Sequence, residues 1–200
     1  LLLIMLVLSS LILSGCWDRR ELNGLALVMG VGIDVCPEDE EIDLTVQVIK
    51  TEAMATPAGN GGGGGDEKQF WNVKRNGENV FAVIRDFTHE VSRKLYFSHN
   101  QIIILGDELL EESCEKYLDF FVRNHETRLS VLVFAAEGRS SDILDVVPEI
   151  TKIPAFDIAS LAQMQANTSQ TVSIRLIDLV NAMASESKEP VLPILKIKNS

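Results

Sequence analysis

Positive charge is scarce in this chain of 200 residues. Lysine and arginine total 18, against 29 aspartates and glutamates, and the net charge at neutral pH is -11. Proteins bind nucleic acid mainly through cationic side chains that meet phosphates, so this balance argues against a nucleic-acid partner. It equally argues against electrostatic attachment to anionic lipid headgroups.

Residues and motifs of common catalytic and metal sites are also sparse. The three histidines, His89, His99 and His125, do not have the spacing of metal ligands. The chain has neither the G-x-S-x-G motif of serine hydrolases nor the P-loop of nucleotide-binding proteins. We therefore predict no catalytic residues, no metal and no enzymatic activity.

Cysteine is present only three times, at Cys16, Cys36 and Cys114. Cys114 occupies an apolar position in a predicted helix, where a buried free thiol is the ordinary expectation. A disulfide between Cys36 and Cys114 stays open, because connectivity cannot be deduced from sequence alone.

The first residues carry the most specific signal of the chain. An uncharged, mostly apolar run begins at Leu1 and closes on Leu13-Ser14-Gly15-Cys16. It has the length of a signal-peptide apolar region and is short for a membrane-spanning helix. The closing residues have the pattern of a lipobox, after which a bacterial signal peptide is cut so that the cysteine can carry lipid. The alternative is an uncut membrane anchor followed by a coincidental cysteine.

The lipobox divides the chain into three parts. We predict a lipoprotein signal peptide over 1–15, a lipid-anchored tether over 16–23, and one domain over 24–200. The covalent diacylglycerol and acyl lipid on Cys16 would be the only added group, and two or more acyl chains give firm anchoring. The domain would then lie outside the cytoplasm. The absence of an initiator Met and of a basic leader leads us to expect a fragment at the amino end. The chain also stops two residues after Lys198, without a tail or a closing helix, so we expect further carboxyl-terminal domains to be missing.

Apolar periodicity predicts an α/β (mixed α+β) fold, in which helices pack against a mixed sheet. An apolar, glycine-punctuated run at 25–35 and an alternating run at 42–48 predict an amino-terminal antiparallel hairpin with its second strand half covered. Further strands are expected at 101–105, 129–136 and 191–198, and helices at 80–95, 107–123, 140–147, 155–166 and 172–184. Ser140 or Ser141 is expected to cap the helix that follows it. The glycine tract within 57–66 is expected to form a surface loop.

Several stretches resemble one known family, the Ger(x)C (GerAC-like) lipoproteins. The resemblance is carried by the following segments: Gly15-Cys16-Trp17-Asp18-Arg19-Arg20-Glu21-Leu22-Asn23, Gly32-Ile33-Asp34, Thr45-Val46-Gln47-Val48-Ile49, Ser92-Arg93-Lys94-Leu95-Tyr96-Phe97-Ser98-His99-Asn100, Leu118-Asp119-Phe120-Phe121-Val122-Arg123-Asn124-His125-Glu126-Thr127-Arg128 and Pro190-Val191-Leu192-Pro193-Ile194. Two departures are the glycine tract and His125, where an acidic residue is more usual.

The resemblance implies a role that composition and spacing do not. Members are the C subunits of spore germinant receptors in endospore-forming bacteria, three-domain α/β proteins on the outer face of the spore inner membrane. They work with a multispanning A subunit and a transporter-like B subunit in a complex that senses nutrients and triggers release of ions and dipicolinic acid. Family proteins are roughly twice this length, so the chain would be the signal peptide and the amino-terminal domain.

From these arguments we predict a non-catalytic receptor subunit, needed for receptor assembly or signalling. The alternatives are a lipid-anchored small-molecule-binding protein and an extracytoplasmic hydrolase. Cys16 is the predicted lipidation site. Five further residues are possible partner contacts, or a charged structural network that ties a helix end to a neighbouring strand: Ser98, His99, Arg123, Glu126 and Arg128.

Overall fold

The computed structural model describes residues 24–35, 41–50, 68–91, 93–110, 114–148, 151–167 and 171–198. The predicted signal peptide and tether, including Cys16, lie outside the described residues, as do Cys36, most of the charged turn after it and the whole glycine tract. The strands are β1 (Leu25–Val35), β2 (Ile42–Ile49), β3 (Phe70–Gly77), β4 (Lys94–Tyr96), β5 (Ile102–Leu105), β6 (Leu132–Ala136) and β7 (Ile194–Leu195). The helices are α3 (Val80–Glu90), α4 (Asp107–Leu110), α5 (Glu115–Arg123), α6 (Ser140–Asp145), α7 (Pro154–Asn167) and α8 (Leu176–Met183), and a 3-10 turn, η2, spans Phe97–His99.

The strands form one mixed sheet in the order β3-β2-β1-β5-β6-β7, with β4 paired to the start of β1. β1, β2 and β3 are antiparallel neighbours, whereas β5, β6 and β7 continue the sheet in parallel. This confirms the predicted α/β fold with a mixed sheet and an amino-terminal hairpin. Parallel pairs need a crossover between their strands, and helices provide it here.

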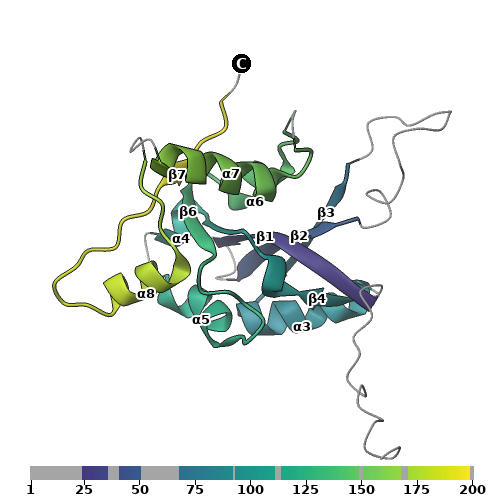
Figure 1. Ribbon diagram of the computed structural model, residues 1–200. Coiled ribbons are helices and arrows are strands. Elements are labelled where there is room, and N and C mark those ends of the chain that lie inside the picture. Colours follow the sequence, from purple (N-terminus) through teal and green to yellow (C-terminus); the bar gives the residue numbers. More distant parts are fainter. Residues whose placement is uncertain are drawn as a thin grey trace, which may run out of the picture.

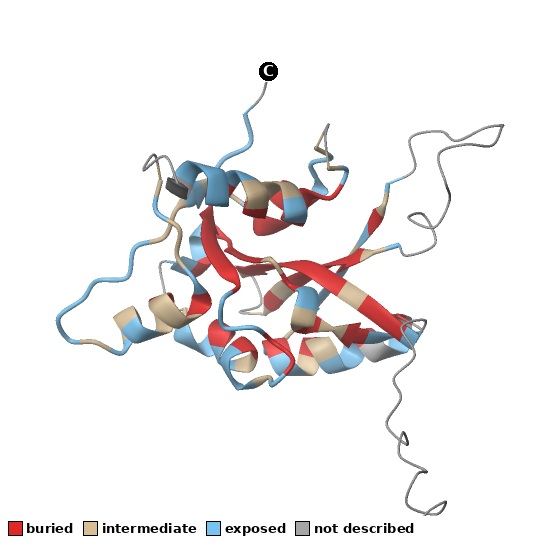
Figure 2. Cartoon of the chain, viewed as in Figure 1, coloured by how far each residue is buried: buried red, intermediate tan, exposed pale blue. Residues whose placement is uncertain are grey.

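Helices cover both faces of the sheet (Figure 1). One core contains side chains of α3, α4, α5 and α8, and the other contains side chains of α6 and α7. Neighbouring residues of the central strands divide between the two cores, since Ile103 and Leu105 join the first and Ile102 and Ile104 join the second. The central strands are therefore buried along most of their length (Figure 2), which explains their continuous apolar sequence.

A bulge in β1 decides which of its residues face α6 and α7. The register with β2 shifts between Val28 and Gly30, so Val28 and Val31 face the same core although they are three residues apart. After the shift, Gly30 and Gly32 lie against α7 and α6, whose side chains leave no room for a Cβ. The glycines of β1 thus allow these two helices to approach the sheet closely.

The structure corrects several predicted elements. The helix from Val80 ends at Glu90, because Val91 is already extended and Leu95 belongs to β4. β3 lacks the apolar pattern that predicts a strand, because its sequence is largely polar. It forms a strand because it pairs along its whole length with β2. The predicted helix at 107–123 is described as α4 and α5, β6 begins three residues later than expected, and β7 has only two residues.

The strand β2 is covered on both faces rather than half covered. Thr45 and Gln47 alternate with apolar residues as predicted, yet both are buried. Gln47 reaches the backbone of α6 and α7 by hydrogen bonds, so burial of its amide is compensated. An alternating pattern therefore does not distinguish a solvent-facing polar side chain from one that is buried and bonded.

Substituting Gly30 tests the close approach of α7. A Cβ at Gly30 would lie 2.8 Å from Ala155 Cβ and 3.3 Å from both Ile102 Cγ1 and Leu144 Cδ2. Gly30→Ala is expected to lower the free energy of unfolding by about 1–3 kcal/mol, as overpacking does, in urea denaturation. Gly24→Ala is the control, because no atom lies within 4 Å of its added Cβ. Adding Ala155→Gly to Gly30→Ala should recover part of the loss, and equal stability of the two alanine variants would contradict the packing.

Candidate functional site

Two of the predicted candidate residues, Ser98 and Glu126, come together beside β4. The Glu126 carboxylate is buried and accepts a 2.7 Å hydrogen bond from Lys94 Nζ, while its backbone carbonyl accepts one of 3.0 Å from Ser98 Oγ. Asn124 Oδ1 accepts from the Glu126 backbone N–H at 2.9 Å. These contacts tie the connection after α5 to β4 and η2, which is the geometry of a structural network.

The other three candidates lie elsewhere. Arg123 bonds Asp119 at 2.7 Å, one turn back on α5, and both side chains are exposed. His99 is exposed, and its ring centre lies 6.2 Å from that of Tyr96. Arg128 lies in the connection between α5 and β6, where it lines a cavity. The five residues therefore do not form one cluster.

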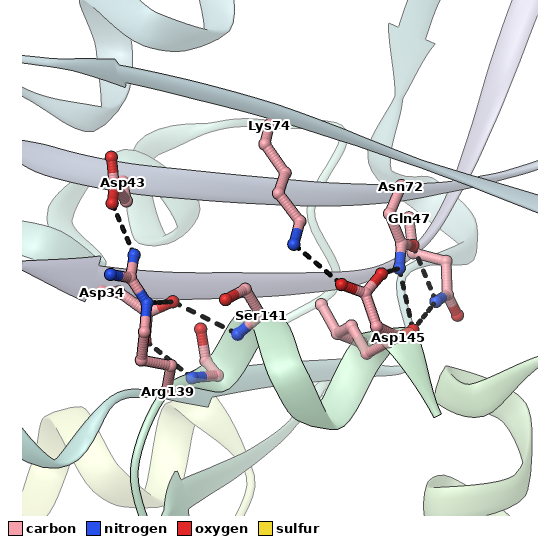
Figure 3. A network of polar contacts seen from close by, with 10 residues as sticks. Asp34, Asp43, Gln47, Asn72, Lys74, Arg139, Ser141 and Asp145 are labelled. Carbon is pink, nitrogen blue, oxygen red and sulfur yellow. Dashed lines mark hydrogen bonds and ion pairs between the residues drawn. The ribbon is translucent and has the colours of Figure 1, made fainter. Parts of the chain in front are cut away.

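A carboxylate that the sequence did not suggest, Asp34, closes the end of β1 (Figure 3). Asp34 Oδ1 accepts from the Ser140 backbone N–H at 2.6 Å, and Oδ2 accepts from that of Ser141 at 3.2 Å. Arg139 Nε lies 3.9 Å from Asp34 Oδ2, and the same guanidinium bonds Asp43 through Nη2. Burial raises the pKa of Asp34, and the two backbone bonds and Arg139 offset part of this shift.

This carboxylate replaces the cap that was predicted for α6. Ser140 and Ser141 lie inside the helix, and Arg139 holds the capping position without a side-chain cap bond. Their amides instead bond Asp34, which precedes Ser140 by 106 residues. A carboxylate at a helix start satisfies unpaired N–H groups and complements the helix dipole. The sequence signals for Asp34 were a charge near the end of an apolar strand and its place in the Gly32-Ile33-Asp34 segment of the family resemblance.

A chain of amide groups holds the other end of α6, as Figure 3 also shows. Gln47 Nε2 donates to the Leu144 carbonyl at 3.0 Å and to Asn72 Oδ1 at 2.9 Å, and Gln47 Oε1 accepts from the Ala155 N–H at 3.0 Å. Asn72 Nδ2 donates to the Leu144 carbonyl and to Asp145 Oδ1, each at 2.8 Å. These bonds tie β2 and β3 to the end of α6 and the start of α7.

Lys74 completes this chain through a 2.8 Å ion pair with Asp145. Partial burial raises the pKa of Asp145, but the hydrogen bonds from Lys74 and Asn72 outweigh burial and hold that pKa below its ordinary value. The side chain therefore stays ionised at neutral pH. Like Asp34, it serves to fix α6 on the sheet.

The remaining predicted features concern metals, membranes and thiols. Within the described residues, no group of three or more His, Cys, Asp and Glu side chains is placed to hold a metal ion. In the same part of the chain, no helix combines the length and apolar character needed to cross a membrane. Cys114 is free and half-buried, with its Sγ 3.4 Å from Met183 Sδ, and burial raises the pKa of its thiol.

Comparison with known proteins assigns the family. The sequence model of one protein family, described as the spore germination protein N-terminal domain, matches residues 18–197 of this chain. The chain belongs to this family. Membership confirms the GerAC-like resemblance, and the match covers every element of the sheet described above.

Individual relatives agree with the family assignment. The chain is 31% identical to spore germination protein KC of Bacillus subtilis (strain 168) over 196 residues, which cover 96% of this chain and 48% of the relative. It is 32% identical to spore germination protein A3 of the same organism over 143 residues, which cover 70% of this chain and 36% of that protein. The chain therefore spans about half the length of spore germination protein KC and about a third of the length of spore germination protein A3. No solved structure matches it.

Removing the Asp34 carboxylate tests its structural role. Asp34→Ala leaves the buried amides of Ser140 and Ser141 without their acceptor, and each unpaired buried donor destabilises the fold. We expect the free energy of unfolding to fall by about 2–4 kcal/mol in urea denaturation. Asp43→Ala is the matched control, because it removes only a half-exposed pair with Arg139 and should lower stability by less than about 1 kcal/mol. If Asp34→Ala lowered the free energy of unfolding by no more than Asp43→Ala does, the capping role of Asp34 would be contradicted.

The raised pKa of Asp34 predicts how the free energy of unfolding depends on pH. Because burial raises this pKa above its ordinary value of 3.8, the folded protein keeps a proton that the unfolded chain has already released. Between pH 3.8 and the folded-state pKa, the Asp34 contribution to the free energy of unfolding should therefore fall as pH rises. Asp34→Asn cannot titrate and should lack this slope, which urea denaturation at several pH values measures. Parallel pH profiles of the two proteins would contradict the shift.

Proposed function

We propose that this chain is the amino-terminal part of a lipid-anchored, non-catalytic subunit of a spore germinant receptor. The observation that carries the proposal is the family match over 18–197, together with relatives that are named as spore germination proteins. In this proposal the subunit lies on the outer face of the spore inner membrane. It supports assembly or signalling of a complex with a multispanning A subunit and a transporter-like B subunit.

The sequence supports attachment through Cys16. The cysteine follows an apolar, uncharged run and precedes the first charged residues. A chain with a net charge of -11 gains nothing from an anionic bilayer, so a covalent lipid would supply the attachment. The eight residues from 16 to 23 can span at most roughly 29 Å when fully extended. The folded domain would therefore stay close to the membrane and at high effective concentration near membrane-embedded subunits.

The described polar clusters support a non-catalytic role. The carboxylates of Asp34, Glu126 and Asp145 each bond groups of this chain and join its own helices and strands. Such contacts fix the relative positions of α6, α7 and β4 against the sheet. A body held in this way suits a subunit that presents a surface to partner subunits.

Replacing Cys16 in the full-length gene tests the proposal. Cys16→Ala should remove the lipid, release the protein from the spore membrane fraction and abolish nutrient-triggered release of dipicolinic acid. Fractionation with immunoblotting and a dipicolinic acid assay measure the two effects. Cys114→Ala is the matched control, since it removes a half-buried thiol of the folded domain and should leave attachment and response intact.

Two results would count against this function. A normal response with the protein still in the membrane fraction would show that Cys16 is not the anchor. A normal response after loss of attachment would remove the receptor role and favour the alternative, a lipid-anchored small-molecule-binding protein.

A further inference from the structure

A polar cavity of about 590 Å³ lies at the amino ends of β5 and β6. Four segments that are distant in the sequence line it: Asn100 and Gln101 before β5, Arg128 and Ser130 before β6, Gln163 of α7, and the turn from Ser173 into α8. Its volume falls in the range of small-molecule sites. It is separate from the Asp34 network, which lies at the carboxyl end of β1.

The cavity holds one cationic group without a counterpart. Arg175 also lines it, but its guanidinium is bound by Asp178 through bonds of 2.7 and 3.0 Å. The Arg128 guanidinium, by contrast, forms no hydrogen bond or ion pair with any residue in the described part of the chain. In a chain with a net charge of -11, a planar guanidinium left open at a cavity is suited to bind a carboxylate in bidentate geometry.

A buried amide on the same cavity also lacks a partner. Asn100 is only 4% exposed, and neither its Oδ1 nor its Nδ2 has a hydrogen-bond partner among the described residues. Its backbone N–H, by contrast, is bonded to the Phe97 carbonyl. Burying an unpaired amide destabilises a fold, and such a group calls for an explanation. A ligand with neutral polar groups would provide the missing partners.

The charge balance distinguishes between anions. The cavity has one unpaired guanidinium, and the Asp178 carboxylate stands at the same cavity beside Arg175. A doubly charged phosphate would meet this carboxylate with a second negative charge that nothing offsets. A single carboxylate is matched by Arg128 alone. The remaining lining groups, such as the Ser130 and Ser173 hydroxyls and the Gln163 amide, suit hydroxyl or amide groups of the ligand.

We propose that this cavity binds a small monocarboxylate that also carries hydroxyl or amide groups, with its carboxylate on Arg128 and its neutral groups toward Asn100. The site goes beyond the proposed receptor role, because binding belongs to this domain alone and does not need the lipid anchor. A negative binding result would therefore leave the Cys16 experiment unaffected.

Calorimetric titration of the purified full-length protein tests the site. Gluconate is the hydroxyl-bearing probe and N-acetyldiglycine the amide-bearing probe. Sorbitol and N-acetyldiglycinamide have the same neutral groups without the charge. We expect at least one acid to bind, both neutral counterparts to bind at least tenfold more weakly, and inorganic phosphate to bind more weakly than the acid.

Three variants then locate the site. Arg128→Gln should weaken binding of the acid at least tenfold without changing the melting temperature, because the Arg128 side chain bonds no described residue. Arg85→Gln, an equal change of charge on α3 outside the cavity lining, should bind like the wild type. Asn100→Leu should weaken binding and raise the melting temperature by about 2–4 °C, since an unpaired buried amide is replaced by an apolar side chain of similar size.

Several outcomes would overturn the proposal. Binding of neither acid, equal binding of the neutral counterparts, or tighter binding of phosphate would each exclude a monocarboxylate site. Unchanged binding in Arg128→Gln would place any bound acid elsewhere. A lowered melting temperature in Asn100→Leu would show that its amide supports the fold rather than a ligand.

Discussion

The carboxylate of Asp34 lies where the end of β1, the turn after β5 and the first turn of α6 meet. Its two oxygens accept from the Ser140 and Ser141 amides, and the Gly106 N–H donates to the neighbouring Ile33 carbonyl at 2.8 Å. Buried backbone amides must be paired, so the start of α6 depends on this one side chain. α6 is in turn joined to α7 by the Gln47 side chain, which donates to the Leu144 carbonyl and accepts from the Ala155 N–H. The layer on that face of the sheet is held by these polar contacts, by its close approach to the glycines of β1 and by the apolar core that α6 and α7 form with the central strands.

The two ends of the parallel strands have different characters. In open α/β sheets, ligands usually bind beyond the carboxyl ends of the strands, where helices begin. Here Asp34 and Arg139, at the carboxyl end of β1, bond groups of the chain itself. At the amino ends of β5 and β6, the Arg128 guanidinium and the Asn100 side-chain amide have no hydrogen-bond partner among the described residues.

The same region contains the structural contacts of Glu126. Lys94 and Ser98 hold Glu126 against β4 and η2, while Arg128, two residues later, faces the cavity. Within this short polar stretch, Glu126 bonds within the fold, whereas Arg128 lines the cavity.

The sequence by itself determined the family, the mixed α/β fold, the amino-terminal hairpin and most helices, because each depends on local periodicity or on contiguous motifs. It misplaced elements where pairing outweighed local pattern: β3 is polar but pairs along β2, and Leu95 continues a helical spacing but joins β4. Only the tertiary structure decided the contacts between distant residues. Asp34 caps a helix that begins 106 residues later. Ser98 hydrogen-bonds the Glu126 carbonyl, whereas Arg123 forms an ion pair with Asp119. Side-chain partners depend on which segments the sheet brings together, and spacing along the chain does not contain that information.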